Sequence, residues 1–279
     1  LPILFKSGNL DVPFKDIKTV YVDEVQDRIY VGAHAGGMMV LHRKSGYIEY
    51  YNRHNSNLPS NNIYSIISDG YGGLWVASLE YLLHFDIDKR NFTIVDVDED
   101  GHKLQQYNRL LFCDSKKRIW AGGEMGISVF NQVGTSLLPN TDFQIASVLK
   151  QAFVNCFYET SSGYLWIGTR NGLFALKESD KQFLQYTTEN GLPSNVIYGI
   201  LEDAYGRLWI STNQGLSCLN PESGKFRNFT IMDGLQGNQF NAGAYCRKDN
   251  GYMLFGGVNG ITSFRPETLI DNQIGRAHV

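Results

Sequence analysis

Several common signs of function are missing from this 279-residue sequence. No apolar run approaches the roughly 18 residues that a membrane-spanning helix needs, and the first residues lack the layout of a signal peptide. The formal net charge of −3 comes without blocks of like charge, so we expect neither nucleic acid nor an anionic membrane surface as a partner. Only 7 prolines are present, which argues against an extended, disordered chain.

Motifs that carry chemistry are equally scarce. No zinc-protease, nucleophile-elbow, Walker or dinucleotide-binding motif occurs in the strand-to-helix context that it requires. Neither the 6 histidines nor the cysteines have metal-ligand spacing. We therefore predict no enzyme activity, no cofactor and no metal site in this chain. Four cysteines are present: Cys113, Cys156, Cys218 and Cys246. We expect them to be buried free thiols in strands, with one or two disulfides as the alternative in an oxidising compartment.

The sequence does contain a regular repeat. A tryptophan-centred phrase has four clear copies, and its central position, the anchor, is occupied by Trp75, Trp120, Trp166 and Trp209. Weaker copies place Tyr30 and Leu254 at the anchor, so that the six anchors are 45, 45, 46, 43 and 45 residues apart. A period in the forties built from strand-like pieces is typical of β-propeller blades, because such a unit buries its faces only against copies of itself.

One repeat shows how a blade is expected to form. The fifth contains four strand-like segments joined by turns: 196–201, 207–212, 216–219 and 225–229. We predict an all-β protein, a β-propeller of four-stranded antiparallel blades with six visible repeats, in a single domain over residues 1–279. The approximate repeats are 14–57, 58–103, 104–148, 149–190, 191–233 and 234–269. Residues 270–279 are expected to be a tail, and its ending suggests a cloning remnant.

Two positions near each anchor are constrained. The residue two positions after it is always small, as expected where blades approach closely: Gly32, Ala77, Gly122, Gly168, Ser211 and Gly256. Six positions after it, we predict a positive φ in a short hairpin for Gly36, Gly126, Gly172, Gly215 and Gly260. The second repeat has Tyr81 there, which predicts an altered turn beside Glu80.

The anchors and the acidic residues before them invite functional interpretations. Aromatic platforms bind sugars and bases, but the regular placement of the tryptophans within strands favours packing between blades. An aspartate precedes three anchors by six residues, at Asp69, Asp114 and Asp203. Their matching positions favour a recurring turn over an acid/base pair.

The phrases Leu58–Tyr64 and Leu192–Tyr198 each precede an Asp-x-x-Gly-x-Leu-Trp phrase, and these residues resemble the two-component regulator propeller repeat. The segments 234–241 and 255–267 resemble the last blade before the immunoglobulin-like domain of that family. The resemblance covers nearly the whole chain. It is strongest in repeats two, four, five and six.

This resemblance implies a receptor module rather than a catalyst. Family members are periplasmic sensors of hybrid two-component systems in Bacteroides-type bacteria, in which propellers precede an immunoglobulin-like domain, a membrane helix and a histidine kinase. It implies an oligosaccharide ligand, control of polysaccharide-utilisation genes and a possible homodimer. Propellers of the family often have seven blades, whereas six repeats are visible here. The segment Ile3–Phe5 is either an outer strand of a preceding blade or the strand that completes the sixth.

In a blade of this kind, the turn entering the inner strand and the hairpin between the second and third strands open on one face. That face is the expected pocket, since loops on a rigid scaffold usually carry specificity. Its hairpin tips lie four residues after the anchors, at His34, Leu79, Glu124, Arg170, Asn213 and Val258. Its inner-strand positions lie eleven residues before them, at Thr19, Tyr64, Arg109, Asn155 and Tyr198, with Asn241 equivalent after a one-residue shift.

Within these two sets, charged forks and amphipathic rings suit hydroxyl-rich or acidic ligands best. Arg109, Arg170, Glu124, Tyr64 and Tyr198 therefore rank first, followed by Asn155, Asn213, His34 and Asn241. Solvated loops vary just as freely, so a purely structural role is the alternative for each residue.

Two other functions stay open. One is a scaffold that binds only protein. The other is a propeller lyase or glycosidase, since some propeller lyases share the Gly-x-Leu-Trp phrase and place their sites on the same face. Such an enzyme would need a convergent pair on that face, for example His34 with Glu124.

Overall fold

The computed structural model describes residues 14, 16–78, 80–95, 108–140, 142, 148–149, 152–177 and 182–269. The chain divides into two compact units, Leu1–Phe153 and Val154–Val279, which are described separately. None of the helices among the described residues is long and apolar enough to cross a membrane.

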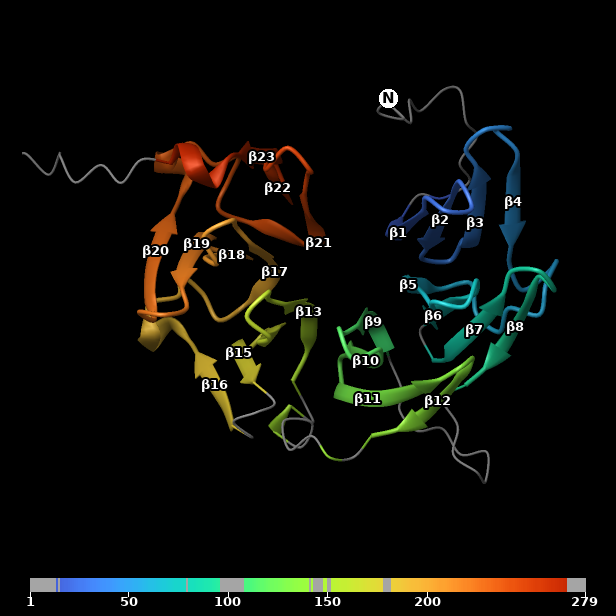
Figure 1. Ribbon diagram of the computed structural model, residues 1–279. Coiled ribbons are helices and arrows are strands. Elements are labelled where there is room, and N and C mark those ends of the chain that lie inside the picture. The colour runs from blue at the N-terminus through green and yellow to red at the C-terminus, as the bar shows by residue number, and fades with distance from the viewer. Residues whose placement is uncertain are drawn as a thin grey trace, which may run out of the picture. The chain divides into compact units, whose positions relative to one another are not determined.

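The N-terminal unit contains three four-stranded antiparallel sheets whose strands follow chain order (Figure 1). The first sheet consists of β1 (Ile17–Asp23), β2 (Arg28–Ala33), β3 (Gly37–His42) and β4 (Ile48–Tyr51). The second consists of β5 (Ile63–Ser68), β6 (Leu74–Ser78), β7 (Leu82–Asp86) and β8 (Asn91–Ile94). The third consists of β9 (Asn108–Cys113), β10 (Arg118–Gly123), β11 (Gly126–Val133) and β12 (Ser136–Pro139).

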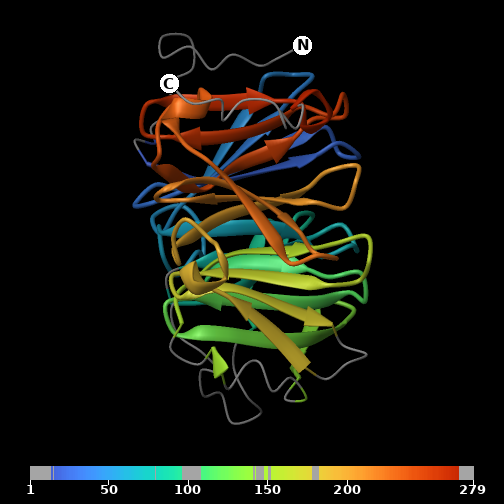
Figure 2. The ribbon, with the colours of Figure 1, turned by 90° about the vertical axis from the view of Figure 1, so that its left-hand side faces the viewer.

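The C-terminal unit repeats this plan, and its sheets succeed one another as layers coloured from yellow to red (Figure 2). The first consists of β13 (Val154–Glu159), β14 (Leu165–Thr169), β15 (Gly172–Lys177) and β16 (Gln182–Tyr186). The second consists of β17 (Ile197–Glu202), β18 (Leu208–Thr212), β19 (Gly215–Asn220) and β20 (Lys225–Phe229). The third consists of β21 (Phe240–Arg247), β22 (Met253–Gly257) and β23 (Gly260–Phe264). The remaining described elements are short 3-10 helices: η2 (Thr188–Asn190), η3 (Ile231–Asp233) and η4 (Pro266–Thr268).

These sheets are the six blades of a β-propeller, three in each unit, which confirms the predicted fold class. In each unit the first strands of successive blades pack against one another, as β1 does with β5 and β13 does with β17. One detail differs from the prediction, because the sixth blade has three strands rather than four among the described residues. The segment Ile3–Phe5, considered for the fourth strand, lies outside those residues.

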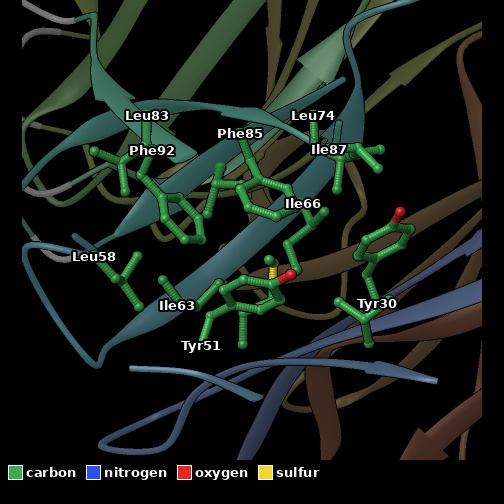
Figure 3. Packing of buried hydrophobic residues seen from close by; sticks show 13 residues of the cluster. Tyr30, Tyr51, Leu58, Ile63, Ile66, Leu74, Leu83, Phe85, Ile87 and Phe92 are labelled. Atoms are coloured by element: carbon green, nitrogen blue, oxygen red, sulfur yellow. The ribbon is translucent and has the colours of Figure 1, made fainter. Parts of the chain in front are cut away.

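The anchors lie in the core between blades. Trp75, Trp120, Trp166 and Trp209 are at most 2% exposed, as expected for packing residues. Where the first blade has Tyr30 instead, a mixed aromatic and aliphatic cluster joins it to the second blade (Figure 3). In that cluster Tyr51 makes an edge-to-face contact with Phe85, with the ring centroids 5.1 Å apart. Aromatic burial therefore binds one blade to the next.

The small residues after the anchors mark close approaches between blades. A Cβ atom at Gly32 would lie 2.5 Å from Cγ2 of Ile63, at the start of the next blade. At Gly168, a Cβ would lie 2.4 Å from Sγ of Cys156 and 2.7 Å from Cγ2 of Ile197. These distances are too short for any side chain, so here the prediction from the repeat is confirmed.

The hairpin prediction is right for four glycines and wrong for one. Gly126, Gly172, Gly215 and Gly260 have φ between 98° and 128°. In the first blade the hairpin is one residue longer, so the positive φ values fall on Ala35 at 57° and Gly37 at 84° rather than on Gly36. In the second blade the hairpin keeps the usual length, because Ala77 pairs with Leu82 as Gly168 pairs with Leu173, and the Ser78 amide donates to the Tyr81 carbonyl. Tyr81 takes the place of the glycine without a positive φ, so the turn differs in backbone conformation, as predicted, and not in length.

The aspartates before the anchors form the expected recurring turn. In the fifth blade, Oδ1 of Asp203 accepts hydrogen bonds from the amides of Tyr205 and Arg207. Its Oδ2 accepts from Arg207 Nε at 2.7 Å and from Trp209 Nε1 at 3.0 Å. Asp114 does the same for Arg118 and Trp120. The carboxylate thus connects the turn to the buried anchor.

The cysteines are free thiols in different surroundings. Cys156 and Cys218 are buried, Cys113 is half-buried and Cys246 is exposed, so the expectation of free thiols holds while that of general burial does not. Burial raises the pKa of the Cys156 thiol to about 12. A thiol in that state is a poor nucleophile at neutral pH, because the thiolate is the reactive form.

Replacing the carboxylate of Asp203 should make the protein less stable to unfolding. We expect Asp203→Ala to lower the free energy of unfolding by about 3 kcal/mol, because the Trp209 indole N–H and the Arg207 guanidinium lose a buried acceptor. Denaturant titration measures this. The control Asp249→Ala changes an exposed aspartate and should shift the free energy by less than about 0.5 kcal/mol. Equal effects of the two changes would contradict the assigned role.

Alkylation should distinguish the exposed cysteine from the buried one. We expect iodoacetamide to modify Cys246 in the folded protein and to reach Cys156 only after denaturant is added. Peptide mass spectrometry locates the modified residues. Early modification of Cys156 would show that its surroundings open in solution.

Candidate functional site

The inner-strand positions chosen from the sequence coincide with breaks in strand register. Pairing between the first and second strands shifts at the bulged residues Tyr64, Arg109, Asn155 and Tyr198. The irregular stretch between Phe240 and Tyr245 includes Asn241. In the first blade the shift falls at Lys18, so the expected equivalence of Thr19 is wrong by one residue. Bulges redirect side chains and often lie beside functional sites.

In the N-terminal unit the hairpin of one blade meets the inner strand of the next. Nδ1 of His34, at the tip of the β2–β3 hairpin, lies 3.3 Å from the Tyr64 hydroxyl on β5. The Ala35 amide donates to Oδ1 of Asn62 at 2.8 Å, and the Gly37 amide donates to the Asn61 carbonyl at 2.8 Å. These bonds fix the hairpin against the turn that enters β5.

Arg109 extends this cluster into the third blade. Its guanidinium lies over the Tyr64 ring, 5.0 Å from the centroid, and 5.7 Å from the centroid of Phe153. Its Nη2 pairs with Glu124 in the β10–β11 hairpin, and the two side chains are 35% and 39% exposed. Its Nε is buried and has no acceptor. The structure therefore joins four predicted residues in one polar cluster: His34, Tyr64, Arg109 and Glu124.

The cluster presents a mixed set of groups at the strand ends. It offers an imidazole, a phenol ring and hydroxyl, a guanidinium with one buried free donor, and a carboxylate. Such groups can hydrogen-bond a hydroxyl-rich ligand and stack against its ring. Sequence reasoning missed Phe153 and Asn62, because their roles depend on the approach of neighbouring blades.

In the C-terminal unit, two of the predicted residues contact the backbone of the next blade or the hydrophobic core. Asn155 Nδ2 donates to the Ile197 carbonyl at 2.8 Å and so links β13 to β17. Tyr198 is half-buried and packs against the core cluster around Trp209. These contacts favour a structural role for the two residues.

Of the other three predicted residues of this unit, two are exposed and one has a buried polar atom. Arg170 is exposed at the tip of the β14–β15 hairpin, and Asn241 is exposed within the irregular part of β21. Asn213, in the β18–β19 hairpin, has a buried Oδ1 without a donor. Asn213 is thus the strongest candidate in this unit.

Catalytic and metal chemistry find little support in this arrangement. No group of three or more histidine, cysteine, aspartate or glutamate side chains capable of holding a metal occurs within the described part of the chain. Two side chains of the cluster, Tyr64 and Arg109, lie between His34 and Glu124. The pair is therefore poorly placed for concerted acid/base work.

Comparison with known proteins identifies the repeats. Residues 57–80, 149–171 and 191–214 match the family described as the two component regulator propeller. Three of the six repeats of this chain are thus similar to two-component regulator propeller repeats. The matched segments begin at or before the turns that enter β5, β13 and β17 and end near the following hairpins, so they contain both parts of the expected ligand face.

Individual relatives agree with this family. A histidine kinase of Formosa agariphila is 29% identical over 195 residues, which are 67% of this chain and 14% of that protein. The extracellular domain of a putative hybrid two component system from B. thetaiotaomicron shares 21% identity with a TM-score of 0.67, over 92% of this chain and 40% of that one. Our propeller chain thus spans a minor part of the length of both.

The fold also occurs in an enzyme. A catalytically inactive virginiamycin B lyase from Staphylococcus aureus shares 14% identity with a TM-score of 0.66, over 91% of this chain and 85% of that one. At this identity the likeness shows a common fold alone. A shared fold does not transfer the catalytic residues of that lyase to this chain.

A double-mutant cycle tests the cluster. We expect Arg109→Ala and Glu124→Ala to show a coupling of about 0.5 kcal/mol in unfolding free energy, since the pair is only partly buried. Denaturant titration of both single variants and the double variant measures it. A coupling of zero would mean that the ion pair does not form in solution.

Proposed function

We propose that this chain is the ligand-sensing propeller module of a hybrid two-component histidine kinase receptor and that it recognises an oligosaccharide. The family match and the histidine kinase relative support the receptor part of this proposal. The polar cluster of His34, Tyr64, Arg109 and Glu124 supports the ligand part.

The observation that carries the ligand proposal is the buried, unpartnered Nε of Arg109. A buried donor without an acceptor costs free energy, which a ligand oxygen can recover. The neighbouring Glu124 carboxylate accepts hydrogen bonds, so a ligand with hydroxyl donors and acceptors satisfies both sides of the pair. An oligosaccharide supplies both kinds of group.

Signalling requires parts outside this chain. In our proposal, the propeller faces the periplasm, and an immunoglobulin-like domain and a kinase follow it in the complete receptor, which acts as a homodimer. The regulated genes would serve polysaccharide use. The ligand changes kinase output only if it favours one arrangement of the receptor over another, because equal affinity for both shifts nothing.

Thermal denaturation with a panel of neutral and acidic oligosaccharides tests the proposal. Ligand at about 100 times its dissociation constant should stabilise the protein by about 2.7 kcal/mol. Arg109→Ala should abolish this shift. Arg43→Ala, with a similarly exposed arginine that pairs with Asp27, is the matched control and should keep it.

The chemical fate of the glycan decides between function classes. A sensor leaves the glycan intact, as mass spectrometry would show, whereas cleavage would replace our proposal with an enzyme. If no glycan shifts the melting temperature of the wild-type chain, oligosaccharide recognition by this module is wrong. A shift that Arg109→Ala leaves intact would move the site away from the cluster.

A further inference from the structure

The C-terminal unit contains a cavity at the opposite strand ends from the candidate face. It has a volume of about 260 Å³ and lies between the blade β13–β16 and the blade β17–β20. The second blade contributes the turn around Tyr205 and the turn from Asn220 to Glu222. These turns join the first strand to the second and the third to the fourth, whereas Arg170 and Asn213 lie in the hairpins at the other end.

A small residue at the floor creates the hollow. Trp166, Ala175 and Leu184 lie side by side across β14, β15 and β16. In the other tryptophan-anchored blades, the residue beside the anchor on the third strand is larger: His84, Val129 or Cys218. Ala175 therefore leaves space between Trp166 and Leu184, and Leu184 remains 53% exposed.

The anchor that lines this cavity also lacks the hydrogen bond that the other anchors make. Trp120 and Trp209 donate to the turn aspartates, and Trp75 donates to Gln132. In the fourth blade Thr160 takes the place of the aspartate, and its hydroxyl is engaged by Ser162 and the backbone of Tyr164. Trp166 Nε1 is left buried with no acceptor.

Aromatic rings form the walls. Tyr186 stacks on Trp166, with centroids 5.8 Å apart and an interplanar angle of 28°, and the Tyr164 and Trp166 centroids are 6.2 Å apart. Tyr205, 67% exposed, closes the side formed by the next blade. The only charged side chain among the lining residues is that of Glu222, which is exposed.

We propose that this cavity binds one neutral pyranose unit. The C–H faces of a sugar ring pack against the electron-rich faces of aromatic rings. Sugar oxygens accept from the Trp166 indole N–H, and sugar hydroxyls donate to the Glu222 carboxylate. Two cations lie near the walls, and both are held over tyrosine rings: Lys177 Nζ is 5.1 Å from the Tyr164 centroid, and Arg207 Cζ is 5.1 Å from the Tyr205 centroid. Together with Glu222 they leave no large excess charge, which suits a neutral ligand. A proline ring has no hydroxyl group that could donate to the Glu222 carboxylate. The volume fits a single ring.

This site is separate from the Arg109 cluster, and it goes beyond the proposed function. Oligosaccharide recognition by the cluster depends on Arg109, whereas pyranose binding here depends on Tyr205 and Trp166. An experiment can therefore disprove pyranose binding in this cavity without disproving oligosaccharide recognition by the Arg109 cluster, and the reverse.

The test uses the indole signals of the four tryptophans in ¹⁵N-correlated NMR spectra, assigned with Trp166→Phe. Titration with methyl glucoside, methyl galactoside, methyl mannoside and methyl xyloside should move the Trp166 indole signal and leave that of Trp75 in place. We expect Tyr205→Ala to weaken binding at least about tenfold, the loss of roughly 1.4 kcal/mol.

The chain offers a matched control in Tyr71. It occupies the same turn position in the second blade, two residues after Asp69, and is 68% exposed. Tyr71→Ala should leave the affinity unchanged, as should Arg109→Ala. Glu222→Gln should weaken binding while the melting temperature stays the same, since the structure gives this exposed side chain no partner among the described residues.

Three outcomes would overturn the proposal. The Trp166 signal could remain in place with every pyranoside, or Tyr71→Ala could weaken binding as much as Tyr205→Ala does. A proline-rich peptide that moves the Trp166 signal when the sugars do not would replace the sugar by a peptide partner.

Discussion

The structure depends on how closely one blade can approach the next. Gly32 lies against Ile63, and Gly168 lies against Ile197, at distances that leave no space for a Cβ atom. Within each unit, this contact places the second strand of a blade beside the inner strand of the next blade, as β2 lies beside β5 and β14 beside β17. A blade alone exposes its apolar faces, so the packing of successive blades supplies most of the hydrophobic burial. The aromatic anchors fill the layer that the contact creates.

The same contact builds the candidate site. Once an inner strand is held against the preceding blade, the bulge at its start directs a side chain toward the neighbouring hairpin. Tyr64 reaches His34 in this way, and Arg109 lies over Tyr64. Because the bulge recurs while the residue there varies among lysine, tyrosine, arginine and asparagine, one scaffold can present many surfaces. Such a scaffold can thus change its surface without changing its fold.

The turn before the anchor tryptophan also differs between blades, and the difference explains the unpaired indole N–H in the fourth blade. In the third and fifth blades the aspartate turn satisfies the anchor indole and holds an arginine, as Asp203 does for Trp209 and Arg207. The fourth blade has Thr160 and Tyr164 at the corresponding positions, and its indole has no acceptor. These different residues leave the fold intact, because the Trp166 ring still packs in the hydrophobic core. They also leave a polar atom and a hollow available for another use.

The sequence alone determined the blade type, the number of visible repeats, the buried anchors and the recurring aspartate turns, because each depends on local spacing repeated along the chain. The inner-strand positions that it selected coincide with single bulged residues in four of the six blades. Tertiary structure decided the rest. The longer first hairpin moved the positive φ from Gly36 to Ala35 and Gly37, and Phe153 joined Arg109 only through folding. Which polar side chains meet depends on the packing of one blade against another, and the spacing within one repeat carries no information about that.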